Sequence, residues 1–196
     1  MEWNDGKTRC HWANPDNPRY VRYHDEEWGV PVHDDYKLFE MLILENFQAG
    51  LSWECVLNKR DAFRRAFDGF DIKKVSAYGE DKLLALQNDS GIIRNKLKIY
   101  AAVNNARIFQ SIQQEQGSFD RYLWNWTDGK TIYETGKVNS PLSDAVSKDL
   151  KKRGMKFVGT VIIYAYLQAV GVVNSHEPDC FLARYREESA GAADAL

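Results

Sequence analysis

The sequence predicts an all-α fold, or one with very few strands. Apolar residues recur at helical spacing, glycine, serine and proline stand where helices would begin or end, and alternating strand patterns are scarce. The 196 residues are enough for one good-sized core, or for two small lobes that share one. We therefore expect a single helical domain over residues 1–184, with two lobes possible. The remaining tail, residues 185–196, is small and polar and is expected to be disordered.

The first predicted helix covers residues 34–47. Asp34 and Asp35 provide a cap and a negative first turn. Its apolar series is Leu38, Met41 and Leu42. The next position in that series is Glu45, so a carboxylate stands on the apolar face of its own helix. The ordinary alternative is a glutamate at a helix end that reaches solvent.

Two further helices are predicted before residue 118. Ser52 is the expected N-cap of a helix that runs on towards Phe67. A long helix follows the turn at Gly91 and stops at Gly117. One face of this long helix is apolar and contains Ile99, Ala102, Val103, Ala106 and Phe109. A short helix is expected within residues 117–126, and loop or irregular extended structure over residues 127–141.

The last two predicted helices are joined by a very short link. The first opens at Ser140 and Pro141 and ends at Gly154, and the second begins near Val158 and ends at Gly171. A tight turn before a helix N-terminus can aim backbone N–H groups at a phosphate. The link and the end of the helix before it contain Lys151, Lys152, Arg153, Gly154, Lys156 and Gly159. The pattern equally fits an ordinary helical hairpin with solvated lysines.

Composition narrows the class of protein. No apolar run is long enough to span a bilayer, and the polar N-terminus is not a secretory signal. Without export, three cysteines indicate a reducing compartment, with free thiols or metal ligands rather than disulfides. A net charge of −2 counts mildly against DNA binding. Two runs are nevertheless locally basic, residues 92–98 and 148–157, and each also fits a solvated helix face.

The stretch "VNSHEPDC" places His176 and Cys180 four residues apart, as metal-ligand pairs often are. Cys10 and His24, near the other end of the chain, are candidates to complete a Cys2His2 set, which would be closed and structural. Spacing alone does not fix the partners, because other histidines are available, namely His11 and His33. Cys55 stands within a predicted helix and is interpreted as a small core residue.

Four blocks in order now indicate a family: "YHDEEWGVP", "LFEMLILENFQAGLSW", "GIIRNKLKI" and "DLKKRGMKFVGTVIIYAYLQAVGVVNSH". From about Cys10 to Cys180 the chain closely resembles the bacterial 3-methyladenine DNA glycosylase I family. The resemblance implies the helix-hairpin-helix DNA glycosylase fold, with the termini joined by one structural zinc ion. By position, its ligands fall on Cys10, His24, His176 and Cys180.

The resemblance also implies base-excision repair of DNA damage. The expected enzyme is a monomeric cytoplasmic hydrolase, active at the nucleoid, that cleaves the N-glycosidic bond of 3-methyladenine in alkylated double-stranded DNA. An N3-alkylated purine is cationic and already a good leaving group, so a pocket that reads the flipped base matters most. Aromatic faces and a carboxylate suit a cationic ring.

Site residues follow from the same resemblance. Glu45 aligns with the base-recognition glutamate and is the catalytic candidate, while Tyr23 and Trp53 align with base-contacting aromatics. Trp12 and Tyr20 stand in the same N-terminal block, where lining the pocket and packing in the core are equally good interpretations.

The DNA-contacting residues and the reaction type complete the prediction. The superfamily's hairpin falls on the basic link described above. Leu51 could wedge into the gap left by a flipped base, or act as an ordinary helix-end leucine. Asp179 lies between proposed zinc ligands and receives no catalytic role, and no lysine is placed for Schiff-base chemistry, so we expect a monofunctional glycosylase. Two other classes stay open: a non-catalytic reader of alkylated DNA with the same fold, and a small zinc-stabilised interaction module.

Overall fold

The computed structural model describes residues 5–183. These residues form mostly helix, as the sequence predicts. The helices are α1 (Pro18–Glu26), α2 (Asp35–Gln48), α3 (Trp53–Asn58), α4 (Arg60–Ala66), α5 (Ile72–Ser76), α6 (Glu80–Asn88), α7 (Lys96–Gln116), α8 (Phe119–Trp124), α9 (Pro141–Lys152) and α10 (Thr160–Ala169). Two 3-10 turns, η1 (Asp68–Phe70) and η2 (Asn125–Thr127), and two strands, β1 (Ile132–Tyr133) and β2 (Val173–Asn174), complete the described elements. The tail predicted over residues 185–196 lies outside them.

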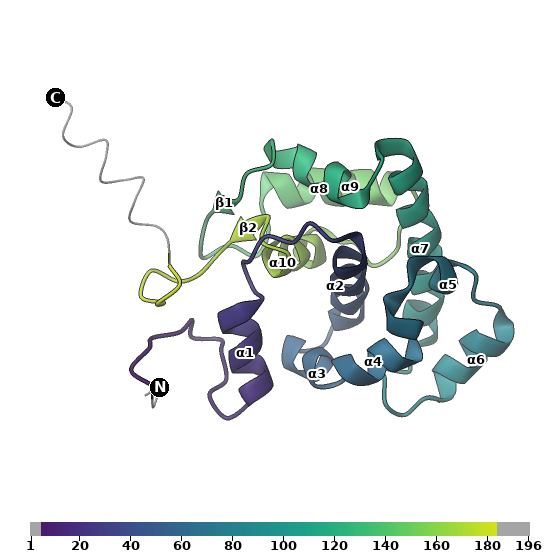
Figure 1. Ribbon diagram of the computed structural model, residues 1–196, viewed down its shortest axis with the longest axis horizontal. Helices are drawn as coiled ribbons and strands as arrows, with labels where there is room; N and C mark the ends of the chain where they lie inside the picture. The colour runs from purple at the N-terminus through teal and green to yellow at the C-terminus, as the bar shows by residue number, and fades with distance from the viewer. Residues whose placement is uncertain (1–4, 184–196) are drawn as a thin grey trace.

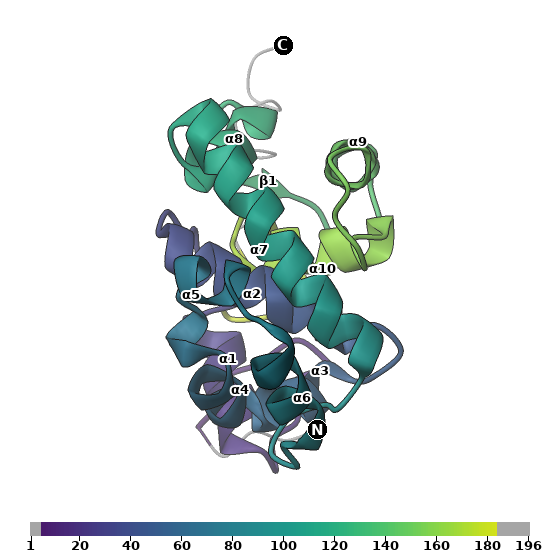
Figure 2. The ribbon, with the colours of Figure 1, turned by 90° about the vertical axis from the view of Figure 1, so that its right-hand side faces the viewer.

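Helix α2 occupies the centre of the molecule. In Figure 1 it lies between a group formed by α8, α9 and α10 and a group formed by α1, α3 and α4. Asp34 caps it by accepting a hydrogen bond from the N–H of Lys37 at 2.8 Å. Every residue from Leu38 to Phe47 is buried, so the helix is enclosed on all sides. In Figure 2 the long helix α7 crosses in front of α2, and it contacts α2 as well as α5, α6 and α8.

Several predicted helix boundaries are confirmed. Ser52 caps α3, with its hydroxyl accepting from the N–H of Cys55. Gly117 ends α7 at a φ of +90°, where a residue without a side chain is favoured. Ser140 caps α9, and Pro141 is its first residue.

Other boundaries differ from the prediction. The helix expected from Ser52 towards Phe67 is two helices, α3 and α4, because the backbone at Lys59 turns to a ψ of 0°. The long helix begins at Lys96, capped by Asn95, rather than directly after Gly91. Helix α10 begins at Thr160, two residues after the expected start.

The described strands form a single two-stranded parallel ladder between residues far apart in the chain. Ile132 pairs with Val173 and Tyr133 pairs with Asn174. Strand β1 lies in the segment predicted to be loop or irregular extended structure. The ladder fixes the segment before α9 beside the segment that follows α10.

Gly171, just before β2, stands where no side chain fits. Its φ is +72°, and an added Cβ would lie 2.3 Å from the carbonyl carbon of Val30 and 2.4 Å from the nitrogen of Pro31. We expect Gly171→Ala to lower the free energy of unfolding by about 2–3 kcal/mol, since backbone atoms cannot move aside. Urea denaturation measures this. Gly129→Ala is the matched control: its φ is +74° with open space around it, so a loss of about 1 kcal/mol is expected.

Within residues 5–183, no helix combines the length and apolar character that crossing a bilayer requires.

Candidate active site

A cavity of about 390 Å³ opens between α1, α2, α3 and α10. Its walls bring together all five residues predicted to bind a base: Trp12, Tyr20, Tyr23, Glu45 and Trp53. The volume suits a purine-sized ligand, and aromatic rings dominate the lining. For Trp12 and Tyr20, the pocket-lining interpretation therefore holds, although both also pack against the core.

Glu45 is the unusual group in this cavity. Its side chain is only 2% exposed, and its Oε2 atom has no hydrogen-bond partner among the described residues. No cationic side chain of residues 5–183 forms an ion pair with it. Burial alone therefore raises the pKa of Glu45 to about 8. The alternative of a helix-end glutamate that reaches solvent is wrong.

The aromatic rings pack against one another around the cavity. The rings of Tyr23 and Trp53 lie 5.2 Å apart between centroids, and those of Trp12 and Tyr20 lie 5.3 Å apart. Burial raises the pKa of Tyr20 to about 12 and that of Tyr23 well above its usual value, so both phenols stay neutral. The cavity thus presents neutral π-faces beside one uncompensated acid.

Other residues at the cavity were not predicted. The ring of Trp28 packs against that of Trp12, with 4.8 Å between the ring centroids. Gln48 follows Glu45 by three residues and lies on the same face of α2. The i, i+3 spacing could have indicated Gln48, whereas nothing in the sequence pattern singles out Ser175. Lys137 also lines the cavity, although the sequence indicated no lysine placed for Schiff-base chemistry, and its ammonium is paired with Glu134 at 2.5 Å.

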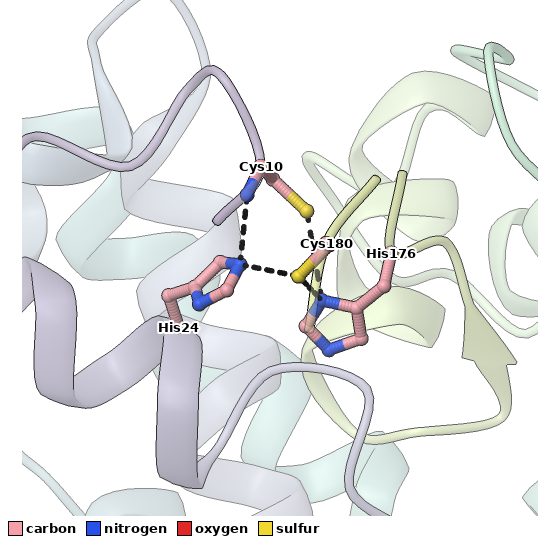
Figure 3. A group of neighbouring side chains, drawn as sticks. All are labelled: Cys10, His24, His176 and Cys180. Atoms are coloured by element: carbon pink, nitrogen blue, oxygen red, sulfur yellow. Dashed lines mark hydrogen bonds between the residues drawn. The ribbon is translucent and has the colours of Figure 1, made fainter. Parts of the chain in front are cut away.

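Four buried side chains form a cluster that could hold a metal ion: Cys10, His24, His176 and Cys180. Their ligand atoms all lie within 4.8 Å of one another. Figure 3 shows His24 reaching from the end of α1 and His176 and Cys180 from the segment after β2. Cys180 Sγ lies 3.6 Å from His24 Nε2 and 3.5 Å from His176 Nδ1, and Cys10 Sγ lies 3.5 Å from the same His176 nitrogen.

The second nitrogen of each clustered imidazole has its own partner. His24 Nδ1 lies 2.8 Å from a carboxylate oxygen of Asp25, which Arg9 holds in turn, and His176 Nε2 lies 3.2 Å from the carbonyl oxygen of Trp28. These contacts orient the remaining nitrogens toward the thiols. Burial lowers the pKa of His24, and lowers that of His176 to about 4, which favours the neutral form that binds metals.

The remaining candidate ligands lie elsewhere. His11 is exposed and contacts Glu177, and His33 is mostly exposed and bonded to Asp120. Cys55 is half-buried on α3 rather than a core residue.

The link between α9 and α10 is a tight hairpin built on two left-handed residues, Gly154 at a φ of +98° and Phe157 at +56°. Asn105 holds it by donating to the carbonyl of Lys156 and accepting from the N–H of the same residue, both at 2.9 Å. Asn46 donates to the carbonyl of Phe157 at 3.0 Å and accepts from Asn105 at 2.8 Å. Since Asn46 follows Glu45 in α2, the hairpin is fixed directly to the helix that carries the buried acid.

The predicted DNA-contacting residues are not equally available. Lys151, Lys152 and Lys156 are exposed around the hairpin. Arg153 is already engaged, with its guanidinium bonded to Asp149 at 2.7 Å and to Glu115 at 2.6 Å. Gly154 and Gly159 flank the turn and are partly buried.

Leu51 is 44% exposed, in the turn that follows α2. Lys98 stabilises this turn. Its ammonium donates hydrogen bonds to the carbonyl oxygens of Phe47 at 2.8 Å and Ala49 at 2.5 Å. The interpretation of residues 92–98 as a solvated helix face is wrong for Lys98, which is 6% exposed. Its positive charge stabilises the partial negative charge of the carbonyl groups at the C-terminus of α2.

An aromatic cavity with a buried acid, on a helix that is also bonded to a hairpin with exposed lysines, is the arrangement expected of a protein that binds a base flipped out of DNA. Comparison with known proteins agrees. A family model described as methyladenine glycosylase matches residues 12–183. The chain belongs to the methyladenine glycosylase family.

Individual relatives support the same assignment. The chain is 46% identical over 179 residues to DNA-3-methyladenine glycosylase 1 of Escherichia coli, with 88% of this chain and 95% of that protein covered. A crystal structure of 3-methyladenine DNA glycosylase I superimposes with a TM-score of 0.85 at 44% identity, covering 89% of this chain and 99% of the other. A variant of such an enzyme, in complex with 3-methyladenine, matches with a TM-score of 0.84 at 33% identity, covering 88% and 95%.

Proposed function

We propose that the chain is a monofunctional DNA glycosylase that hydrolyses the N-glycosidic bond of 3-methyladenine in alkylated double-stranded DNA. The observation that carries this proposal is Glu45, an acid buried without a counter-charge among neutral aromatic rings. A neutral base would leave that acid uncompensated, whereas a cationic base supplies the missing charge. The relatives named above act on the same lesion according to their names.

The chemistry follows from the charge of the lesion. The methylated purine is cationic in DNA and leaves as a neutral base, so strong general-acid help is not needed. Tyr23 and Trp53 offer aromatic surface to the ring, and the carboxylate of Glu45 accepts hydrogen bonds from its edge and stabilises the positive charge that passes to the sugar. Water is the nucleophile. Asp179 is exposed and outside the cavity lining, and the ammonium of Lys137 is occupied by Glu134, so neither is given a role in bond cleavage.

The metal that best fits the cluster is zinc, in a structural role. Zinc–sulfur bonds of about 2.3 Å and zinc–nitrogen bonds of about 2.0–2.1 Å at tetrahedral angles separate sulfur from nitrogen by about 3.6 Å. Three of the cluster's sulfur–nitrogen distances, at 3.5 to 3.6 Å, match this value, and all four ligand atoms lie within 4.8 Å of one another. Two thiolates and two imidazoles fill all four positions, so the ion would cross-link the two ends of the domain without binding substrate.

The hairpin between α9 and α10 is the proposed helix-hairpin-helix contact with the DNA backbone. Its backbone N–H groups near Gly159 and the N-terminus of α10 suit a phosphate, and the exposed lysines add affinity without sequence preference. Leu51 is the proposed wedge, because it is exposed at the end of the helix that carries Glu45. We further propose that the protein works as a monomer on the chromosomal DNA of the bacterial cytoplasm.

Removing two of the hairpin lysines tests the DNA contact. Lys151→Ala combined with Lys156→Ala should lower the slope of log affinity against log salt concentration by about 2, since each phosphate contact contributes about 0.9. Fluorescence anisotropy with duplex DNA over a range of salt concentrations measures the slope. Lys130→Ala removes an exposed lysine outside the hairpin and serves as the control, and an equal effect there would contradict the assignment.

The activity itself is tested with methylated duplex DNA. The purified metal-loaded protein is incubated with the DNA, and the released bases are separated by chromatography. Release of 3-methyladenine is the expected result. Binding without release would make the chain a reader of alkylated DNA, and the absence of both would leave only a metal-stabilised interaction module.

A further inference from the structure

Buried polar atoms without a hydrogen-bond partner gather around the cavity. Of the few such atoms among the described residues, four belong to side chains that line it: Glu45 Oε2, Gln48 Oε1, Trp53 Nε1 and Ser175 Oγ. Most buried polar groups in proteins are paired, because an unpaired one loses its hydration without compensation. The proposed base accounts for Glu45, but Ser175 has no role in the function proposed so far.

Ser175 is held rigidly at the cavity wall. It is 7% exposed and lies between Asn174, the last residue of β2, and His176, a member of the metal-binding cluster. The carbonyl of Asn174 accepts from the N–H of Glu134 at 3.1 Å, and its side-chain oxygen accepts from the N–H of His176 at 3.3 Å. With both neighbours anchored, the backbone of Ser175 is fixed at the cavity wall, and its hydroxyl has no hydrogen-bond partner among the described residues.

The alternative is that Ser175 is only a small residue that packs well. Alanine would fill nearly the same volume without burying a hydroxyl, so packing does not explain the oxygen. A ligand that enters the cavity does explain it. Binding sites often contain polar groups that lower the stability of the free protein because they are unpaired there, and that form hydrogen bonds once the ligand is bound.

We infer that Ser175 is a base-contacting residue whose hydroxyl donates a hydrogen bond to a ring nitrogen of the flipped purine. Glu45 and Gln48 offer acceptor oxygens, which suit the hydrogens of an exocyclic amino group. A ring nitrogen without a methyl group is an acceptor and needs a donor, which the hydroxyl supplies. The inference rests on the proposed function and adds a second contact, from the segment after β2, to the one made by α2.

The test compares base affinity with stability in the intact metal-loaded protein. Binding of free 3-methyladenine is followed by the fluorescence of the tryptophans that line the cavity, and stability by urea denaturation. For Ser175→Ala we expect an affinity about 10-fold weaker and a urea midpoint that is unchanged or higher. Ser143→Ala is the control, because Ser143 is also buried but is hydrogen-bonded to Ser140 and Thr160, outside the cavity. It should lower the urea midpoint and leave base affinity within twofold.

Each outcome decides the matter. A base affinity of Ser175→Ala within twofold of the parent would overturn the inference, and so would a lower urea midpoint, which would assign the hydroxyl to the fold. If the unchanged protein does not bind 3-methyladenine at all, the proposed function fails and the inference fails with it. If the parent binds the base and Ser175→Ala binds it equally well, only the inference fails.

Discussion

Replacement of Glu45 by glutamine should lower excision of 3-methyladenine by about 100-fold, or roughly 2.7 kcal/mol of transition-state stabilisation. The amide keeps the size of the side chain and one acceptor oxygen but removes the negative charge that complements the cationic base. The effect should appear in kcat/KM for base release from methylated duplex DNA. An excision rate equal to that of the parent would show that Glu45 has no part in catalysis.

The same substitution should make the free protein more stable, with a defined dependence on pH. The pKa of Glu45 is raised from 4.5 to about 8, so the folded state keeps its proton where the unfolded chain has lost it. The parent therefore loses stability as pH rises from 4.5 to 8, by roughly 4 kcal/mol in all, and the glutamine variant does not. Below pH 4.5 the two should be equally stable. Urea denaturation at pH 5 and pH 8 measures the difference.

Glu40→Gln is the matched control on the same helix. Glu40 is also buried, but its carboxylate is bonded to Arg60 at 2.6 Å and to Arg64 at 2.9 Å. Breaking that pair leaves a buried guanidinium without one of its partners, so this variant should lose stability. Excision per folded molecule should be unchanged, since Glu40 does not line the cavity.

Replacement of Cys180 by serine should lower the free energy of unfolding by about 3–5 kcal/mol, because metal binding and folding are coupled. Serine is a poor zinc ligand, and three ligands hold the ion less tightly than four. The expected result is a loss of bound zinc by elemental analysis together with a lower urea midpoint. Treatment of the parent protein with a strong chelator should lower its midpoint by a similar amount.

Cys55→Ser controls for the chemical change. Cys55 is half-buried and outside the cluster, so its replacement should keep the zinc and change stability by no more than about 1 kcal/mol. Absence of zinc from carefully purified parent protein would refute the metal assignment. So would equal stability of the parent with and without chelator.

The parts of the structure that sequence reasoning predicted well are those with a local signal. The apolar series along α2 placed Glu45 on a buried face, and the structure has it there. The pair His176 and Cys180 indicated ligands, and Cys10 and His24 were candidate partners. Only the resemblance to a family selected these two partners, because spacing gives no information across 150 or more residues. The structure brings these four together.

Other features escaped prediction because tertiary contacts decide them. Helix α1 was not predicted, although Asn17 caps it and Pro18 opens it, because it is short and polar. The basic run that contains Lys98 gives no sign that this ammonium turns inward to cap α2. The break at Lys59 is equally invisible, since nothing in the residues around it disfavours a continuous helix.

The cluster at Cys10, His24, His176 and Cys180 also bears on how the chain is made. A nascent chain presents its first two ligands early, but the other two are added only when synthesis has passed residue 180. A metal ion at the proposed site would therefore lock the domain only after almost all of it has been translated, and a product truncated before His176 has half a site. Zinc content would then distinguish finished from unfinished molecules, and unfinished ones would remain open to proteases.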